Sequence, residues 1–144
     1  MSRAWVDGGA ASAHVAAMHS TDLPRPTWPA LARGFGLTCP QCGTGRLYGR
    51  FLKVNPSCGS CGAELHHHRA DDAPPYFTIV IIGHLVVPGM LLLEQLVAPP
   101  TWVQVALWVP TIVVGALWLL PRVKGALIGF QWAHRMHGFG GEVD

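Results

Sequence analysis

Charged side chains are scarce in this sequence. Lysine and arginine together number 10, and aspartate and glutamate 8, so 12% of the 144 residues are charged. Soluble domains carry roughly 25% charged residues. A chain with so little charge keeps much of its surface out of water. The net charge of +2 is too small to indicate a polyanionic partner by itself.

The first residues also lack the apolar run that a cleavable secretion signal requires. Small residues such as Gly8, Ala10 and Ser12 dominate there instead. We therefore expect no signal peptide, and we expect residues 1–26 to form a disordered tail.

Two long apolar runs dominate the second half of the chain. Residues 77–97 contain one acidic side chain, Glu94, and residues 102–120 contain no formal charge. As helices they would be about 31 and 28 Å long, close to the roughly 30 Å hydrocarbon core of a bilayer. The turn at residues 98–101 is so short that the two helices must run antiparallel. The alternative, two buried core helices, leaves too few other residues to cover them.

The positive charges predict how the hairpin is oriented. The turn between the runs has no lysine or arginine, whereas basic residues flank both runs on their other side. They are Arg46, Arg50, Lys53 and Arg69 before the first run, and Arg122, Lys124 and Arg135 after the second. The positive-inside rule then puts both termini in the cytosol. We expect a membrane protein, with the lipid bilayer as its first partner.

The four cysteines lie between positions 39 and 61. They form two C-x2-C pairs, Cys39 with Cys42 and Cys58 with Cys61, at the spacing of a structural zinc site. Glycine follows each pair, at Gly43 and Gly62, and allows the positive φ that such turns need. A zinc ion bound by four thiolates has no open position, so the site is expected to be structural. An iron–sulfur or redox site, or unligated thiols, are the alternatives.

The fold class that these features predict is a two-helix transmembrane hairpin preceded by a small cytosolic zinc ribbon with short β-strands. The expected domains are a tail at 1–26, the ribbon and linker at 27–76, transmembrane helices at 77–97 and 102–120, and a cytosolic interfacial tail at 121–144. For residues 121–144, a continuation of the second helix is an equally good interpretation.

The linker between ribbon and hairpin is rich in histidine and aspartate. The run His66, His67, His68 binds metal weakly in other settings, but a solvated linker is the simpler interpretation. Asp71 and Asp72 precede the first apolar run, and we expect them to cap its helix. Acid–base catalysis by this pair is the alternative, but the sequence shows no partner or pocket for it.

Three strongly polar residues lie within the first apolar run: His84, Glu94 and Gln95. His84 would lie about 10 Å into the membrane. Such side chains are costly in lipid and usually face protein or water. His84 and Gln95 share one helix face with Pro88 and Leu91, which we expect to contact the second helix or another subunit. The alternative is that His84 ligates haem or copper, or takes part in a proton relay.

The chain resembles the bacterial domain-of-unknown-function family 983, over about residues 27–132. The motifs that carry the resemblance are Cys39-Pro40-Gln41-Cys42-Gly43 with Gly45-Arg46-Leu47, Cys58-Gly59-Ser60-Cys61-Gly62, Ala70-Asp71-Asp72-Ala73-Pro74-Pro75-Tyr76-Phe77, Gly83-His84 with Val87-Pro88, and Arg122-Val123-Lys124-Gly125-Ala126-Leu127. Ala73 departs from the family, which often has glycine there.

The resemblance implies a cytosolic ribbon on an inner-membrane hairpin, and a role beside respiratory haem–copper oxidases and their assembly factors. It implies no catalytic residue. We therefore expect a non-enzymatic accessory or assembly protein with zinc as its cofactor, and with a membrane protein or a second copy as its partner. Metal or redox handling, with zinc, copper or haem, is the first alternative. The second is a nucleic-acid-binding ribbon using Arg46, Arg50 and Lys53. The few interleaved aromatics argue against it, so no nucleic acid is expected.

Overall fold

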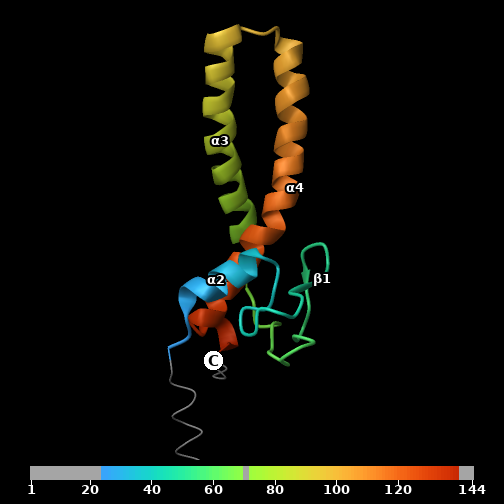
Figure 1. The fold of residues 1–144 in the computed structure, drawn as a ribbon, viewed down its shortest axis with the longest axis vertical. Coiled ribbons are helices and arrows are strands. Elements are labelled where there is room, and N and C mark those ends of the chain that lie inside the picture. The colour runs from blue at the N-terminus through green and yellow to red at the C-terminus, as the bar shows by residue number, and fades with distance from the viewer. Residues whose placement is uncertain (1–23, 70–71, 140–144) are drawn as a thin grey trace, which may run out of the picture.

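The computed structural model describes residues 24–69 and 72–139. Its elements in chain order are α2 (Thr27–Phe35), β1 (Tyr48–Arg50), β2 (Lys53–Val54), α3 (Ala73–Val97), α4 (Thr101–Ala133) and the 3-10 turn η1 (Met136–Gly138). Helices α3 and α4 form a long hairpin, and α2 and the strands gather around its open end (Figure 1).

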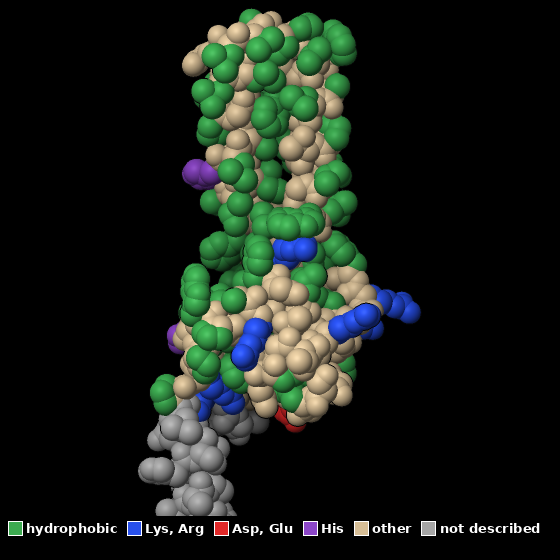
Figure 2. Space-filling view, in the orientation of Figure 1, with side chains coloured by type: hydrophobic (Ala, Val, Ile, Leu, Met, Phe, Trp, Pro, Cys, Tyr) green, Lys and Arg blue, Asp and Glu red, His purple; other side chains and the backbone are tan. Residues whose placement is uncertain are grey.

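The hairpin has the composition of membrane-spanning helices. Helices α3 and α4 are both long and apolar enough to cross a membrane, with mean hydropathies of 2.1 and 2.0. Apolar side chains cover the hairpin in Figure 2, while lysine and arginine gather around its base. Helix α3 begins at Ala73 and not at residue 77, where the first apolar run begins, because Pro74 and Pro75 suit the first helical turn.

The predicted turn between the spans is confirmed. Helix α3 ends at Val97, and Ala98 takes the left-handed conformation with φ 43°. The N–H of Ala98 donates to the carbonyl oxygen of Glu94 at 3.0 Å and so closes the last helical turn. Prolines 99 and 100 follow, and α4 begins at Thr101.

Helix α4 continues well beyond the expected membrane boundary at residue 120. The segment that we expected to be part of an interfacial tail, 121–144, is helical as far as Ala133. Residues of this lower half are buried by the ribbon: Pro121, Val123, Gly125, Ile128, Gly129, Trp132 and Ala133. The lower half of α4 is therefore a core helix of the ribbon and not a separate surface helix.

Small residues let α2 cross α4 at very close range. A Cβ atom added to Gly34 would collide with the backbone of Gly125, and one added to Gly125 would collide with the backbone of Gly34. One turn along, Gly129 lies equally close to the carbonyl of Ala30. Ala30 and Gly34 are the buried residues of α2, so one face of this helix packs on α4.

One apolar core joins the ribbon to α4. Its members come from α2, from α4 and from the segments outside the helices and strands: Ala30, Cys39, Leu47, Cys58, Leu65, Ile128, Trp132, Ala133 and Phe139. Tyr48 of β1 and Val54 of β2 pack against it. Arg25, expected in the tail, lies 4.5 Å from the Trp132 ring and donates to the Trp132 carbonyl oxygen at 2.8 Å. The folded part thus includes residues 24–26, while the rest of the expected tail lies outside the described residues.

Candidate metal centre and the intramembrane polar face

The two C-x2-C segments fold as matching turns. In the first, the N–H of Gly43 donates to the Cys39 carbonyl oxygen at 2.8 Å. In the second, the N–H of Gly62 donates to the Cys58 carbonyl oxygen at 2.9 Å. Gly43 and Gly62 have φ values of 73° and 71°, the left-handed region that glycine adopts without strain. The expected role of both glycines is confirmed.

The turns bring the four sulfur atoms together. All four Sγ atoms lie within 4.8 Å of one another. Cys39 and Cys61 are 3.8 Å apart between sulfurs, and Cys42 and Cys58 are 3.7 Å apart. Tetrahedral thiolates at a zinc–sulfur distance of about 2.3 Å have edges of about 3.8 Å. The predicted cluster is confirmed as a set of four ligands that could bind a metal ion.

Hydrogen bonds and burial push the thiol pKa values apart. The hydroxyl of Thr44 donates to Sγ of Cys42 at 3.2 Å. Together with the N–H groups of Gly45 and Thr44, it lowers the pKa of Cys42 to about 5. Burial raises the pKa of Cys39 to about 12. A metal ion is bound by thiolates, so Cys39 must lose its proton when the ion binds. The positive charge of the ion favours that loss.

Arg33 supports the first turn from α2, a contact that the sequence did not reveal. Its Nη1 donates to the carbonyl oxygens of Pro40 at 3.2 Å and of Gln41 at 2.9 Å. The basic residues between the two cysteine pairs, 46, 50 and 53, are exposed. No local motif signals Arg33, because its position depends on how α2 packs.

The β-hairpin of the ribbon is fastened to α4 at two points. The Tyr48 hydroxyl donates to the carbonyl oxygen of Pro121 at 2.9 Å. The Lys124 ammonium donates to the carbonyl oxygen of Leu52 at 2.9 Å. Both bonds join residues more than seventy positions apart in the chain, so they link the β-hairpin of the ribbon to the helix that follows the interhelical turn.

The linker is held more firmly than a solvated segment would be. His67 contacts Glu64 at 2.8 Å, and Nδ1 of His68 contacts the Leu65 carbonyl oxygen at 2.9 Å. Arg69 exchanges two hydrogen bonds with the Gln131 side chain, at 3.2 and 2.8 Å.

The expected helix cap is not formed by Asp72. This residue occupies the N-cap position of α3, yet its side chain makes no capping hydrogen bond. Its backbone is already helical, with φ −104° and ψ −23°, whereas a capping residue usually has extended backbone angles. Asp71 lies outside the described residues.

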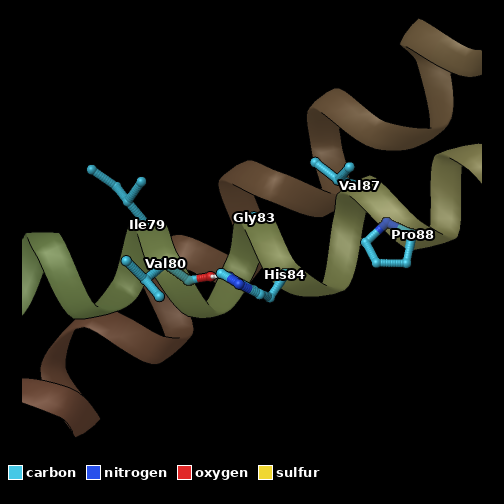
Figure 3. A pocket seen from close by; sticks show the side chains of 6 residues that line it. All are labelled: Ile79, Val80, Gly83, His84, Val87 and Pro88. Atoms are coloured by element: carbon cyan, nitrogen blue, oxygen red, sulfur yellow. Dashed lines mark hydrogen bonds between the residues drawn. The ribbon is translucent and has the colours of Figure 1, made fainter.

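His84 faces away from α4, so its face does not make the first of the two expected contacts, that with the second helix; the other, with another subunit, stays a prediction. His84, Pro88, Leu91 and Gln95 are all exposed. Figure 3 shows the imidazole beside Val80 on the near side of α3, with α4 passing behind. Nδ1 of His84 donates to the Val80 carbonyl oxygen at 2.8 Å. Among the described residues the ring has no other hydrogen-bond partner, and a neutral ring then has Nε2 as an acceptor.

Glu94, by contrast, joins the two helices near the turn. Nε2 of Gln104 donates to its carboxylate at 2.8 Å, and Oε1 of Gln104 accepts from the Trp108 indole at 2.9 Å. The Trp108 ring also lies across Gly89, where an added Cβ would come within 2.6 Å of the ring. Gln104 and Trp108 were missed because their roles depend on the register of the hairpin.

Fold and site together define a small protein in which a four-cysteine ribbon is seated on an apolar helical hairpin. The family described as "Protein of unknown function (DUF983)" matches residues 48–132, and the chain belongs to this family. The match begins later than the resemblance we set, so Cys39 and Cys42 lie outside it. No curated protein and no solved structure matches the chain.

Proposed function

We propose that this chain is a non-enzymatic accessory or assembly protein of the bacterial inner membrane. In this proposal α3 and the upper half of α4 cross the bilayer, both termini are cytosolic, and the ribbon holds a structural zinc ion. The face of α3 around His84 docks against a partner membrane protein. The observation that carries the proposal is the outward direction of His84 on an apolar helix.

Two hydrogen-bond acceptors meet on this face. Nε2 of His84 is one. The backbone carbonyl of His84 is the other, because Pro88 has no N–H to donate to it. In hydrocarbon each unsatisfied polar group costs several kcal/mol. A neighbouring helix with a hydrogen-bond donor would remove that cost, which lipid tails cannot do.

The surface around His84 has room for such a neighbour. A shallow, almost wholly apolar depression of about 400 Å³ is lined by Ile79, Val80, Gly83, His84, Val87 and Pro88 (Figure 3). Gly83 adds to the room, since a Cβ placed there would meet nothing within 4 Å. Small residues at such positions let transmembrane helices approach closely.

Zinc is the proposed ion because four thiolates at tetrahedral spacing fill its coordination shell. A filled shell leaves no position for a substrate, which supports a structural role. The partner class that the family resemblance suggests is a respiratory haem–copper oxidase or one of its assembly factors. Metal or redox handling is the second candidate, favoured by Nε2 of His84, which would also ligate haem iron or copper.

Gentle purification of the tagged chain from its native membranes, followed by mass spectrometry, tests the docking proposal. We expect a stoichiometric membrane partner with the wild type and its loss with His84→Phe. Thr111→Val is the matched control, because it removes another exposed polar group, on α4, whose hydroxyl is bonded to the Leu107 carbonyl. A chain that purifies alone, or a His84→Phe variant that keeps its partner, contradicts the proposal.

A further inference from the structure

A second group of metal-ligating side chains lies next to the cysteine cluster. Glu64, His66 and His67 follow the second C-x2-C turn, and their ligand atoms lie within 4.8 Å of one another. Nε2 of His67 is 2.8 Å from Oε2 of Glu64, and the His66 and His67 ring centroids are 3.9 Å apart. Three donors therefore converge on one point of the surface.

The backbone that carries these donors is fixed. Glu64 pairs with Ser57 in an isolated β-bridge, and Leu65 between the donors is fully buried. The His67 ring packs edge-on against Phe139, with centroids 5.8 Å apart and planes at 70°. Phe139 belongs to the apolar core. Ligands held by packed neighbours lose little freedom when an ion binds.

The spacing of the Glu64 and His67 ligand atoms suits a transition-metal ion after a small adjustment. At bond lengths of about 2.1 Å, neighbouring ligand atoms are about 3.0 Å apart in an octahedral site and about 3.4 Å apart in a tetrahedral one. The pair His67 and Glu64, at 2.8 Å, needs to open by only a few tenths of an ångström. Glu64 and His66 are exposed, so their side chains can make that adjustment.

The chemistry of the donors selects the class of ion. Two imidazoles and one carboxylate suit zinc, nickel and copper, whereas magnesium and calcium prefer oxygen ligands alone. Three protein ligands leave at least one coordination position for water. A depression of about 380 Å³ lies beside two of the ligands, Glu64 and His67, with Arg25, Trp132 and Phe139 among its other lining residues, and offers space for water there.

We propose that Glu64, His66 and His67 form a second metal site, open to solvent and exchangeable, that binds a divalent transition-metal ion. It differs from the cysteine cluster in having incomplete protein ligation and an accessible surface. The site does not depend on docking of α3 to a partner.

Nickel titration of the full-length chain tests the site. The chain is purified in detergent with a tag free of histidine and loaded with one equivalent of zinc, which fills the cysteine cluster and leaves the second site empty. Ni²⁺ uptake is then measured by calorimetry. We expect about one Ni²⁺ per chain with micromolar affinity. Glu64→Gln and His66→Ala should each weaken binding about tenfold or more, since even the loss of an outer partner of a metal ligand costs 10–100-fold.

His68→Ala is the matched control, because His68 belongs to the same run but its Nδ1 is bonded to the Leu65 carbonyl. It should leave the affinity unchanged, and all variants should retain their zinc. The proposal is overturned if no nickel binds, if His68→Ala weakens binding as much as His66→Ala, or if one zinc ion is released for each nickel ion taken up.

Discussion

The hydroxyl of Tyr48 donates a hydrogen bond to the carbonyl oxygen of Pro121, 2.9 Å away. Pro121 is the first buried residue in α4, at the point where the apolar, exposed half of the helix meets the ribbon. Burial raises the pKa of Tyr48 above its ordinary value, so the phenol keeps the proton that it donates. This bond joins β1, which follows the first cysteine pair, to the point in α4 where its exposed half ends.

Tyr48→Phe removes this bond and leaves the ring in place. A hydrogen bond of this kind contributes about 1 kcal/mol to the free energy of unfolding, so we expect a lower melting temperature in detergent. Tyr76→Phe is the control, because Tyr76 is 71% exposed. Equal melting temperatures for the two variants would show that the bond does not hold the ribbon.

Gly125→Ala should be far more damaging. The added methyl group would collide with the backbone of Gly34, which cannot give way as a flexible side chain can, and overpacking of this kind costs about 1–3 kcal/mol or more. Gly83→Ala is the control, since its Cβ would meet nothing within 4 Å. Limited proteolysis of the ribbon should accelerate in the first variant alone. If Gly125→Ala resists protease as the wild type does, α2 does not cross α4 at this point.

The thiols of the metal-free chain should react in a defined order. Cys42, with its pKa lowered to about 5, is a thiolate at neutral pH, whereas Cys39, with its pKa raised to about 12, is a thiol. Pulsed alkylation with mass spectrometry should therefore label Cys42 well before Cys39. The Cys42 thiolate also stabilises the metal-free fold at high pH, and this contribution is lost as the pH falls through about 5.

Thr44→Val should raise the pH at which the Cys42 thiolate becomes protonated. Loss of the hydroxyl donor raises the pKa of Cys42 toward its ordinary value, so alkylation at a fixed low pH becomes slower. Thr38→Val is the matched control, because the Thr38 hydroxyl donates to the Arg33 carbonyl oxygen and not to a sulfur. Unchanged labelling of Cys42 in Thr44→Val would contradict the assigned cause of the low pKa.

Metal analysis of the purified chain should find about one zinc ion per molecule. Cys58→Ser should lose most of it and lower the melting temperature, because a structural zinc site contributes directly to folding. Ser60, which lies between the ligands Cys58 and Cys61, provides the control. Ser60→Ala leaves all four sulfurs in place and should keep the metal. Iron in place of zinc, or metal retained by Cys58→Ser, would argue against the closed zinc site.

Features that depend on neighbours in the chain could be predicted from the sequence. The two apolar helices, the turn at Ala98 and the positive φ of Gly43 and Gly62 all follow from local composition. The convergence of the four cysteines also follows, because the C-x2-C spacing itself reflects how two turns share one ion.

Features that depend on packing between distant segments could not be predicted. Gly34 and Gly125 carry no sign that they face each other. The sequence therefore left two interpretations of residues 121–133, a surface helix or a continuation of the second helix; the continuation is confirmed, but its packing in the ribbon core could not be predicted. The direction of His84 depends on the rotation of α3 against α4, and the helix face alone leaves two directions open. The bond between Glu94 and Gln104 likewise requires the register of the hairpin.

Site-specific photo-crosslinking in living cells tests the docking face most directly. A photoreactive amino acid at Leu91, on the His84 face, should capture one discrete membrane protein partner. The same group at Val114 on α4 should capture none, although Leu91 and Val114 are similarly exposed at 59% and 66%. Capture at Leu91 alone supports an accessory protein that docks through α3. Capture at neither position, or equally at both, would contradict the account.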